Sequence, residues 1–428
     1  MNKNNVWSVF ISTFLFLIVS GSIVLMIPGM YKGNLHYIDA LFTSTSAVCV
    51  TGLVVTNTSN FTLMGQIVII TLIQLGGLGI MVLTTSLLLF LRGELDLQRR
   101  VVITSLIDVY ALNEAEYVLR YIVLYTFFIE IIGAIFLTIG FLMDGHSLIS
   151  SIFHGVFHSV SAFCNAGFSP FDDSIIGMNW LIKVSIMLLI IFGGLGFYVI
   201  YDLHNYFKKR DNKLKRLKVH TKIVLITTAC LIMFGVVILS ILEHDMSLLD
   251  GFFQSVSART AGFNSVDLTK LTNISKFALI ILMIIGASPG GTGGGIKTST
   301  FAIMLLSIKN ILKGDNRILL FNREVHYTNI LKSFSITAMY IFILIVATLL
   351  MLYFYNYDFM DMLFEVASAL GTVGLSLGIT MKIGLAGKII LIICMFVGRI
   401  GVSALVLSLV GYEHVSNIRY PEEKVILG

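Results

Sequence analysis

The sequence predicts an all-α polytopic membrane protein, built from four similar repeats around one pore with pseudo-fourfold symmetry. Composition is the first reason. Of the 428 residues, 57% are hydrophobic and only 12% are charged, whereas a soluble chain of this length needs more charge to cover its surface. Several apolar runs reach the roughly 20 residues that a transmembrane helix requires. The second reason is one short motif that occurs four times.

This motif is a phenylalanine followed by apolar and small residues, with a glycine ten residues later. Its copies read FTSTSAVCVTGLV, FHSVSAFCNAGFS, FFQSVSARTAGFN and FEVASALGTVGLS. They place Phe42, Phe157, Phe252 and Phe364 before Gly52, Gly167, Gly262 and Gly374. Tight helix packing would explain one such glycine. Four copies in one register instead predict four walls of a pore.

Each repeat is predicted to contain a long helix, a short helix, the glycine segment and a second long helix. The first helices are expected at 6–27, 117–143, 219–242 and 328–355, and the short helices at 39–48, 153–163, 249–258 and 361–370. The second helices are expected at 62–91, 179–207, 274–312 and 384–410. The segment between two long helices is too short for two further spans, so it fits a re-entrant loop. The prediction is eight transmembrane helices and four re-entrant pore loops, in repeats 1–95, 96–210, 211–318 and 319–411 with a tail at 412–428.

The two ends of the chain and its charged connections set the expected topology. The apolar run near the N-terminus is too long for a signal peptide and has no small-residue cleavage site, so it is interpreted as a retained first helix. Basic residues concentrate in 92–100, 204–222 and 309–332, which join one repeat to the next. By the positive-inside rule these connections and both termini are cytoplasmic, and the pore loops enter from outside. Because loop charge explains the basic run, no nucleic-acid partner is expected.

The glycine motif suits the coordination of a dehydrated cation. Rings of backbone carbonyls can replace the hydration shell of an ion, and glycine permits the close approach this needs. The short helices point their C-terminal dipole ends at the pore, which favours cations. Asp39, Asp250 and Asp361 begin three of these helices, where they suit N-caps and also make the outer mouth negative. Arg259 precedes Gly262 by three residues, and its side chain is expected to point behind the filter or outward.

The second helices carry a further signal below the filter. The glycine-rich string GASPGGTGGGIKTST, from Gly286, interrupts the third of them and cannot sustain a regular helix. By the helical rise it lies about 18 Å below the start of its helix, where a broken helix makes a natural gate. A phosphate loop is the competing interpretation, but Ile296 separates Gly295 from Lys297 and spoils the required spacing.

Two charged residues lie within apolar helices. Arg399 is near the middle of its run, where an arginine usually faces a partner or a wet cavity, and we expect it at the constriction opposite the loop at 286–299. Glu130 lies similarly in the second repeat, where a structural hydrogen bond and a functional role both remain open. The four cysteines, Cys49, Cys164, Cys230 and Cys394, show no metal-ligand spacing and are expected to be small buried residues.

These features together resemble the Trk/Ktr/HKT family of potassium transporters, most closely its KtrB-type membrane subunits. The resemblance covers essentially the whole chain. It implies an ion-lining set of Val50, Thr51, Gly52, Asn165, Ala166, Gly167, Thr260, Ala261, Gly262, Thr372, Val373 and Gly374. It also implies a gate formed by Gly286, Ser288, Pro289, Gly290, Gly291, Thr292, Gly293, Gly294, Gly295, Lys297 and Arg399.

The resemblance further implies a homodimer with one pore per subunit in the plasma membrane of a bacterium. It implies a cytoplasmic ring of RCK-type (KtrA-type) regulatory subunits, which would hold any nucleotide, because this chain has no Rossmann motif. No covalently bound cofactor is expected. K⁺ would be the permeant ion, and whether Na⁺ activates or is coupled to transport stays open.

The expected function is therefore potassium uptake through a channel-like filter. An alternating-access carrier is the main rival, but many such carriers have inverted repeats, whereas these repeats share one topology. A membrane enzyme is a further alternative, but the sequence shows none of the paired carboxylates, metal clusters or nucleophile–base sets that catalysis would need.

Overall fold

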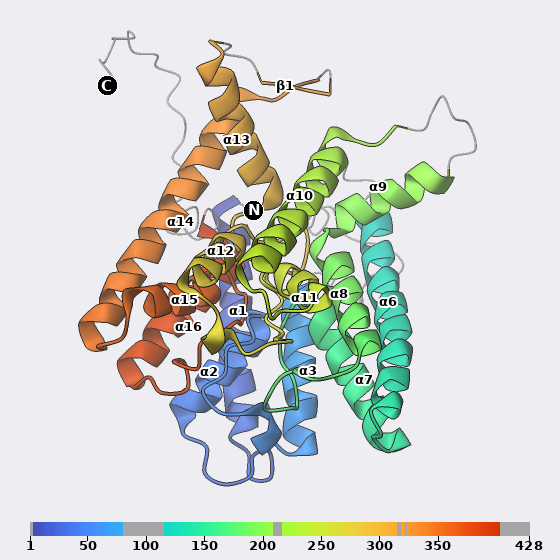
Figure 1. The fold of residues 1–428 in the computed structure, drawn as a ribbon, viewed down its shortest axis with the longest axis vertical. Helices are drawn as coiled ribbons and strands as arrows, with labels where there is room; N and C mark the ends of the chain where they lie inside the picture. The colour runs from blue at the N-terminus through green and yellow to red at the C-terminus, as the bar shows by residue number, and fades with distance from the viewer. Residues whose placement is uncertain (1–2, 80–114, 209–215, 315–317, 322, 403–428) are drawn as a thin grey trace.

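A computed structural model describes residues 3–79, 115–208, 216–314, 318–321 and 323–402. Across these residues the order of long helix, short helix and second helix recurs four times (Figure 1). The first long helices are α1 (Lys3–Leu25), α6 (Ala115–Met143), α10 (Val219–Leu242) and α14 (Tyr327–Phe354). The short helices are α2 (Tyr37–Val48), α7 (Leu148–Phe163), α11 (Leu248–Ser257) and α15 (Phe359–Leu370). The second helices are α3 (Leu63–Leu78), α8 (Trp180–Gly194) with α9 (Phe197–Lys208), α12 (Asn273–Ile284) with α13 (Thr298–Leu312), and α16 (Leu385–Ile400).

The remaining elements are small. Two short 3₁₀ turns lie at Thr58–Asn60 and Leu268–Lys270, each just before a second helix. An antiparallel pair of two-residue strands, β1 (Leu319–Leu320) and β2 (Arg323–Glu324), follows α13. This pair is the one departure from the all-α prediction within the described residues.

The long first helices present large apolar side chains outward. Phe128 of α6 is 62% exposed and Phe342 of α14 is 67% exposed, as lipid-facing positions of a membrane helix require. In Figure 1, α6 and α8 lie on one side of the molecule and α14 and α16 on the other, with α11 and α12 between them. The short helices pack against the long ones and contribute fully buried phenylalanines to one continuous apolar core.

Not every predicted span is a single long helix. Among the described residues, Val118–Met143, Val219–Leu242 and Tyr327–Phe354 are each long and apolar enough to cross a membrane. The pair α8 and α9 would be a fourth span, but it is bent by 94°. The prediction of one continuous helix over 179–207 is therefore wrong.

Glycine explains where the second helices break. α3, α8 and α16 stop just before Gly79, Gly196 and Gly401, whose φ angles are 79°, 89° and 88°. This left-handed backbone is open to glycine and ends an α-helix. The interruption expected only in the third repeat thus has counterparts in the other three, so 62–91 and 384–410 are not continuous helices either.

The aspartates at the short helices are not the caps that the sequence suggested. Asp39, Asp250 and Asp361 are each the third residue of their helix. The cap of α11 is Ser247, and that of α15 is Asp358. A carboxylate in the first turn is still favoured by the helix dipole, and each aspartate has a lysine partner, described below.

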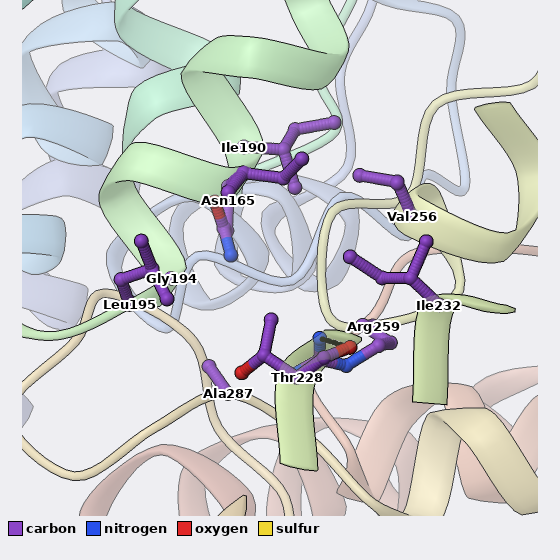
Figure 2. Close-up of a pocket in the computed structure, with 10 residues that line it drawn as sticks. Asn165, Ile190, Gly194, Leu195, Thr228, Ile232, Val256, Arg259 and Ala287 are labelled. Atoms are coloured by element: carbon purple, nitrogen blue, oxygen red, sulfur yellow. Dashed lines mark hydrogen bonds between the residues drawn. The ribbon is translucent and has the colours of Figure 1, made fainter. Parts of the chain in front are cut away.

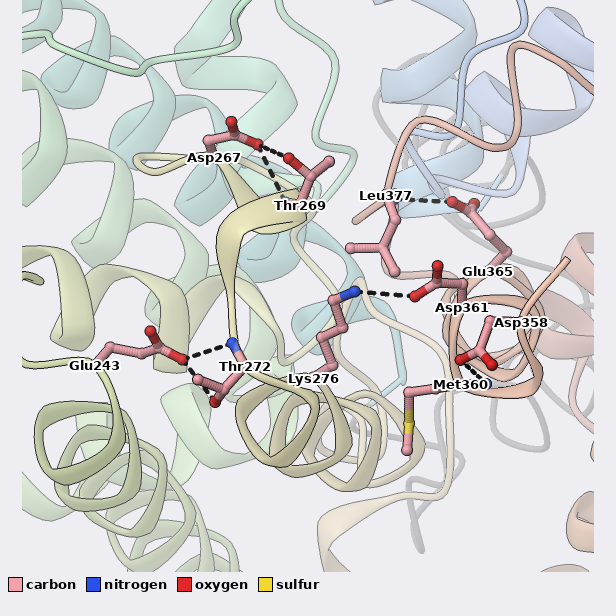
Figure 3. Close-up of polar contacts among 10 residues, drawn as sticks. All are labelled: Glu243, Asp267, Thr269, Thr272, Lys276, Asp358, Met360, Asp361, Glu365 and Leu377. Atoms are coloured by element: carbon pink, nitrogen blue, oxygen red, sulfur yellow. Dashed lines mark hydrogen bonds and ion pairs between the residues drawn. The ribbon is translucent and has the colours of Figure 1, made fainter.

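One carboxylate links the end of α10 to the start of α12. Glu243 accepts hydrogen bonds from the Thr272 backbone N–H and hydroxyl, both at 2.9 Å (Figure 3). Burial alone would raise the pKa of Glu243, but hydrogen bonds from Ser275 and Thr272 outweigh it, so its pKa is lowered. This carboxylate joins the end of one long helix to the start of the next.

Several sequence expectations lie outside the described residues. They are the basic connection at 92–100, the boundary between repeats at 95 and 96, the helix continuations over 80–91 and 403–410, and the tail at 412–428. The part of the basic run at 209–215 also lies outside them.

Candidate functional site, a ring of four glycines above a broken helix

The segments that follow the four short helices share an unusual backbone. Each glycine of the motif has a positive φ, at 93° for Gly52, 68° for Gly167, 77° for Gly262 and 96° for Gly374. The residue two positions earlier also has a positive φ, and these residues are Val50 (56°), Asn165 (60°), Thr260 (76°) and Thr372 (50°). L-residues rarely adopt this conformation. It persists only where the surrounding structure holds it, which is common at functional sites.

The four glycines meet in a closed ring. Each one faces a backbone carbonyl oxygen of the next repeat so closely that a Cβ could not fit. A Cβ on Gly52 would lie 2.4 Å from Ala166 O, one on Gly167 2.6 Å from Ala261 O, one on Gly262 2.3 Å from Val373 O, and one on Gly374 2.1 Å from Thr51 O. The contacts run from repeat 1 to 2, 3, 4 and back to 1. The structure therefore brings together eight of the twelve residues predicted to line the ion path, and the other four are the positive-φ residues directly before them.

Repeat 3 approaches this ring in a different register from the one the sequence suggested. The fully buried phenylalanines of the other repeats are matched by Phe253, which is 0% exposed, and not by the partly buried Phe252. Two residues beyond Phe253, Ser255 donates to Ile232 O of the first helix, as Ser44 does to Ile18 O. Repeat 3 therefore has one residue fewer than the other repeats between its buried phenylalanine and its glycine. Phe252 stands ten residues before Gly262 only because it directly precedes Phe253.

A cavity of ≈ 180 Å³ opens on one side of the ring. The four glycines line it together with polar residues from the segments that follow them, among them Asn57, Asp172, Ser174 and Asn264. The Asp172 carboxylate accepts a hydrogen bond from Ser59 Oγ at 2.6 Å. This polar cavity could receive a hydrated cation before it meets the ring.

The glycine-rich segment after α12 lies against the opposite end of the ring. Cβ atoms on Gly293 and Gly294 would lie 2.0 Å from Thr260 Oγ1 and 2.4 Å from Thr372 Oγ1. The Gly294 N–H donates to Thr372 Oγ1 at 3.1 Å. Since Thr260 and Thr372 precede the ring glycines, the segment lies beneath two of the four walls.

Other contacts hold this segment against the second repeat and against itself. The N–H groups of Ser288 and Thr292 donate to Gly194 O (3.0 Å) and Gly193 O (3.2 Å), where α8 ends. Within the segment, Lys297 Nζ donates to Gly293 O at 2.6 Å. The predicted gate residues from Gly286 to Lys297 thus form one folded loop under the ring.

Arg399 links this loop to the first repeat. Its guanidinium donates to Thr292 O of the loop and to the carbonyls of Gly76 and Gly77 in α3, the last at 3.0 Å. Three carbonyls from two distant segments therefore converge on one side chain. The structure places Arg399 opposite the loop, as the sequence predicted.

Arg259 points away from the ring, as expected. It lines a small cavity of ≈ 20 Å³ behind the segment of repeat 3 (Figure 2). Its guanidinium donates to Gly286 O at 3.3 Å and to Thr228 O of α10 at 3.5 Å. A cation in this position braces the start of the loop without facing the ion path.

Asn165 ties two neighbouring walls together. Its amide and the Thr260 hydroxyl are 3.1 Å apart. The surrounding network favours the orientation in which Asn165 Nδ2 donates to Ala162 O (3.1 Å) and Ile190 O (3.3 Å), while its Oδ1 accepts from Thr260.

Three ion pairs join neighbouring repeats and were missed in the sequence. Lys183 Nζ lies 2.6 Å from Asp250 Oδ1, Lys276 Nζ lies 3.0 Å from Asp361 Oδ1 (Figure 3), and Lys388 pairs with Asp39. Each lysine is the fourth residue of its second helix, and each aspartate the third residue of the next repeat's short helix. That recurring lysine was a signal in the sequence. In α3 the fourth residue is Gln66, which instead bonds the carbonyls of Thr58 and Phe61.

Glu130 of α6 contacts two neighbouring helices. One of its carboxylate oxygens accepts from Gln74 Nε2 of α3 at 3.2 Å, and its backbone carbonyl accepts from Ser159 Oγ at 2.6 Å. The first contact joins repeats 1 and 2 and the second joins two helices of repeat 2, which supports the structural interpretation of this residue.

Comparison with known proteins agrees with this geometry. The sequence profile of the TrkH family, described as cation transport protein, matches residues 2–416. The chain is 37% identical to Ktr system potassium uptake protein B of Vibrio alginolyticus, over 97% of this chain and 93% of the relative. It is 33% identical to potassium/sodium uptake protein NtpJ of Enterococcus hirae, over 97% and 95%.

A solved structure shares the fold. The crystal structure of the potassium transporter TrkH from Vibrio parahaemolyticus superimposes with a TM-score of 0.75 at 19% sequence identity, covering 96% of this chain and 85% of that one. The chain therefore belongs to the TrkH family of cation transport proteins, a family of transporters and not of enzymes.

Proposed function

We propose that this protein takes up K⁺ across the plasma membrane through the ring of four glycines, which acts as a channel-like selectivity filter. The observation that carries the proposal is the closed ring itself, in which the glycine of each repeat lies against a backbone carbonyl of the next repeat with no room for a Cβ. Relatives named as potassium uptake proteins, one of them as potassium/sodium uptake protein, support this choice of ion.

Backbone carbonyls at the ring would replace the hydration shell of K⁺. The short helices α2, α7, α11 and α15 all end at the residues that lead into the ring. Their C-terminal dipole ends therefore favour a cation there. The membrane potential supplies the driving force, about 2.3 kcal/mol per elementary charge per 100 mV.

The loop from Gly286 to Lys297 would act as the gate, with Arg399 as its latch. In the structure this loop contacts Thr260 and Thr372 directly beneath the ring. Arg399 and Lys297 both bond its carbonyls, and the charge of Arg399 would repel K⁺ from the same space. Opening then requires the loop to leave the ring and Arg399 to release Thr292.

The proposal extends to topology and assembly. Eight transmembrane helices and four re-entrant loops, in repeats 1–95, 96–210, 211–318 and 319–411, would form one pore with both termini in the cytoplasm. A homodimer of such subunits would sit on a cytoplasmic ring of nucleotide-binding regulatory subunits. Two relatives are named as components of a Ktr system, and the basic cytoplasmic connections could face such a ring.

Sodium is the second candidate ion, because one relative is named for both potassium and sodium. Here Na⁺ would activate or be coupled to K⁺ transport. Measuring K⁺ influx with and without Na⁺, together with ²²Na⁺ influx under the same conditions, separates the two. Coupling requires Na⁺ to enter in fixed proportion to K⁺, whereas activation does not.

Reconstituted flux tests the main proposal. The purified protein in liposomes, with and without its regulatory subunit, should conduct K⁺ and Rb⁺ in preference to Na⁺. A carrier would saturate at low rates and would be insensitive to Gly262→Ser in the ring. That combination of results would overturn the channel-like mechanism.

A further inference from the structure

We propose that Glu365 is a positioning residue that fixes the filter wall of repeat 4 and thereby sets ion selectivity, with His158 in the same role in repeat 2. The proposal rests on the potassium selectivity proposed above. It starts from one position in each short helix, the residue directly after the buried phenylalanine. That residue is polar in all four repeats and is almost fully buried, at 1% exposed for Thr43 and 0% for His158, Gln254 and Glu365.

Glu365 holds the chain that leaves the ring. Its Oε1 accepts from the Leu377 N–H (Figure 3) and from Ser376 Oγ, both at 2.8 Å, and its Oε2 accepts from Thr380 Oγ1. Three donors therefore converge on the two carboxyl oxygens of this one side chain. The segment they anchor begins two residues after Gly374.

His158 makes the corresponding contact in repeat 2. Its Nδ1 lies 2.8 Å from His154 O and donates to it, which leaves Nε2 to accept from the Ser169 hydroxyl at 3.0 Å. Ser169 Oγ in turn accepts from the Phe171 N–H at 3.1 Å. Ser169 follows Gly167 by two residues, just as Ser376 follows Gly374.

At this helix position, the other two repeats have no such tether within the described residues. Thr43 donates to Asp39 O within its own helix at 2.8 Å. Neither Nε2 nor Oε1 of Gln254 has a hydrogen-bond partner among the described residues. Because the glycine contacts run in the order 1, 2, 3, 4, the tethered walls lie opposite each other across the ring. The walls of repeats 1 and 3 alternate with them.

The tethers therefore hold two opposite walls of the ring in place, those of repeats 2 and 4. Carbonyls that are held at one spacing can favour the larger K⁺ over Na⁺, whereas a wall free to move inward can also coordinate the smaller ion. Glu365 touches no residue of the ring directly. Its effect must therefore pass through Ser376 and Leu377 to Gly374.

The test compares Glu365→Ala with the matched control Thr43→Val, each in the full-length protein reconstituted in liposomes. The K⁺/Na⁺ permeability ratio is measured from reversal potentials, and folding is checked by gel filtration. Loss of the tether should lower the ratio of Glu365→Ala by about tenfold, the effect of one strong hydrogen bond. Thr43→Val removes a buried hydroxyl at the equivalent position and should leave the ratio unchanged.

A second variant keeps the proposal testable if Glu365→Ala does not fold. Ser376→Ala removes one donor and should lower the ratio in the same direction by a smaller factor. In a double-mutant cycle, the free-energy change in the permeability ratio for Glu365→Ala with Ser376→Ala should be smaller than the sum of the changes for the two single variants. An unchanged ratio in folded Glu365→Ala, or in Ser376→Ala, would overturn the positioning role. A wild-type protein that does not select K⁺ would instead overturn the proposed function.

Discussion

Removing the Arg399 side chain should open the path beneath the ring. The guanidinium joins the loop, through Thr292 O, to α3, through the carbonyls of Gly76 and Gly77. In Arg399→Ala this link is lost, and the positive charge of the guanidinium is removed with it. The loop keeps its bonds to Gly193 and Gly194, so it should loosen and not unfold.

The size of the effect follows from the bond to the loop. A hydrogen bond to a charged group contributes about 1.5–3 kcal/mol. If this bond is present only in the closed state, its loss raises the open population by about 10- to 150-fold, at 1.4 kcal/mol per factor of ten. That range holds while the open state remains the minor one, because an equilibrium saturates once both states are populated.

The assay is basal K⁺ influx into liposomes without the regulatory subunit, with the K⁺/Na⁺ ratio measured in parallel. Arg399→Ala should raise basal influx and leave the ratio unchanged. Arg399→Lys keeps the charge but lacks the planar guanidinium that bonds both segments. Its basal influx should therefore lie between that of the wild type and that of Arg399→Ala. Unchanged or lower influx in Arg399→Ala, or a change in the ratio alone, would refute the latch.

Three further outcomes are expected. Deleting residues 293–295 should raise basal influx in the same assay, and an equal or lower influx would count against a gate. Lys276→Met leaves its aspartate partner without a counter-ion in a mostly buried pair, so thermal unfolding should show a loss of about 1–2 kcal/mol. The exposed Lys270→Met should lose less than about 0.5 kcal/mol, and equal losses would contradict this reasoning. The pKa of Glu243 is lowered in the folded protein from its ordinary value of 4.5. The ionised carboxylate therefore stabilises the fold fully above about pH 4.5, and this stabilisation is lost as the pH falls through the lower pKa of the folded state. The melting temperature of Glu243→Gln should therefore fall below that of the wild type at pH 7, and the difference should vanish in acid; a constant difference would contradict the linkage.

Much of the fold could be predicted because hydrophobic length and the glycine motif are local signals. The four long first helices lie within a few residues of their predicted ranges, since a span needs about 20 apolar residues. The ring of four glycines could be expected because the motif repeats. Its register in repeat 3 could not, because Phe252 and Phe253 are adjacent and only burial separates them.

The breaks and the polar contacts depended on long-range packing. A glycine such as Gly196 is tolerated within many helices, and only the folded chain shows φ = 89° at that position. Glu365 and its partners are 11 to 15 residues apart, and Lys388 and Asp39 come from opposite ends of the chain. The lysines and aspartates of the ion pairs recur at fixed helix positions, but nothing local in the sequence shows that they meet across repeats or that Glu365 meets its partners.

The central claim is that four glycines form one ring that selects K⁺. Its most direct test is the K⁺/Na⁺ permeability ratio of Gly262→Ser beside the control Gly145→Ser. Both glycines have a positive φ, 77° and 86°, so both substitutions strain the backbone. Only at Gly262 would the new Cβ meet a carbonyl oxygen, at 2.3 Å, whereas nothing lies within 4 Å at Gly145. The ratio should collapse in Gly262→Ser and remain at the wild-type value in Gly145→Ser. Equal ratios in the two variants would contradict the ring as the selective element.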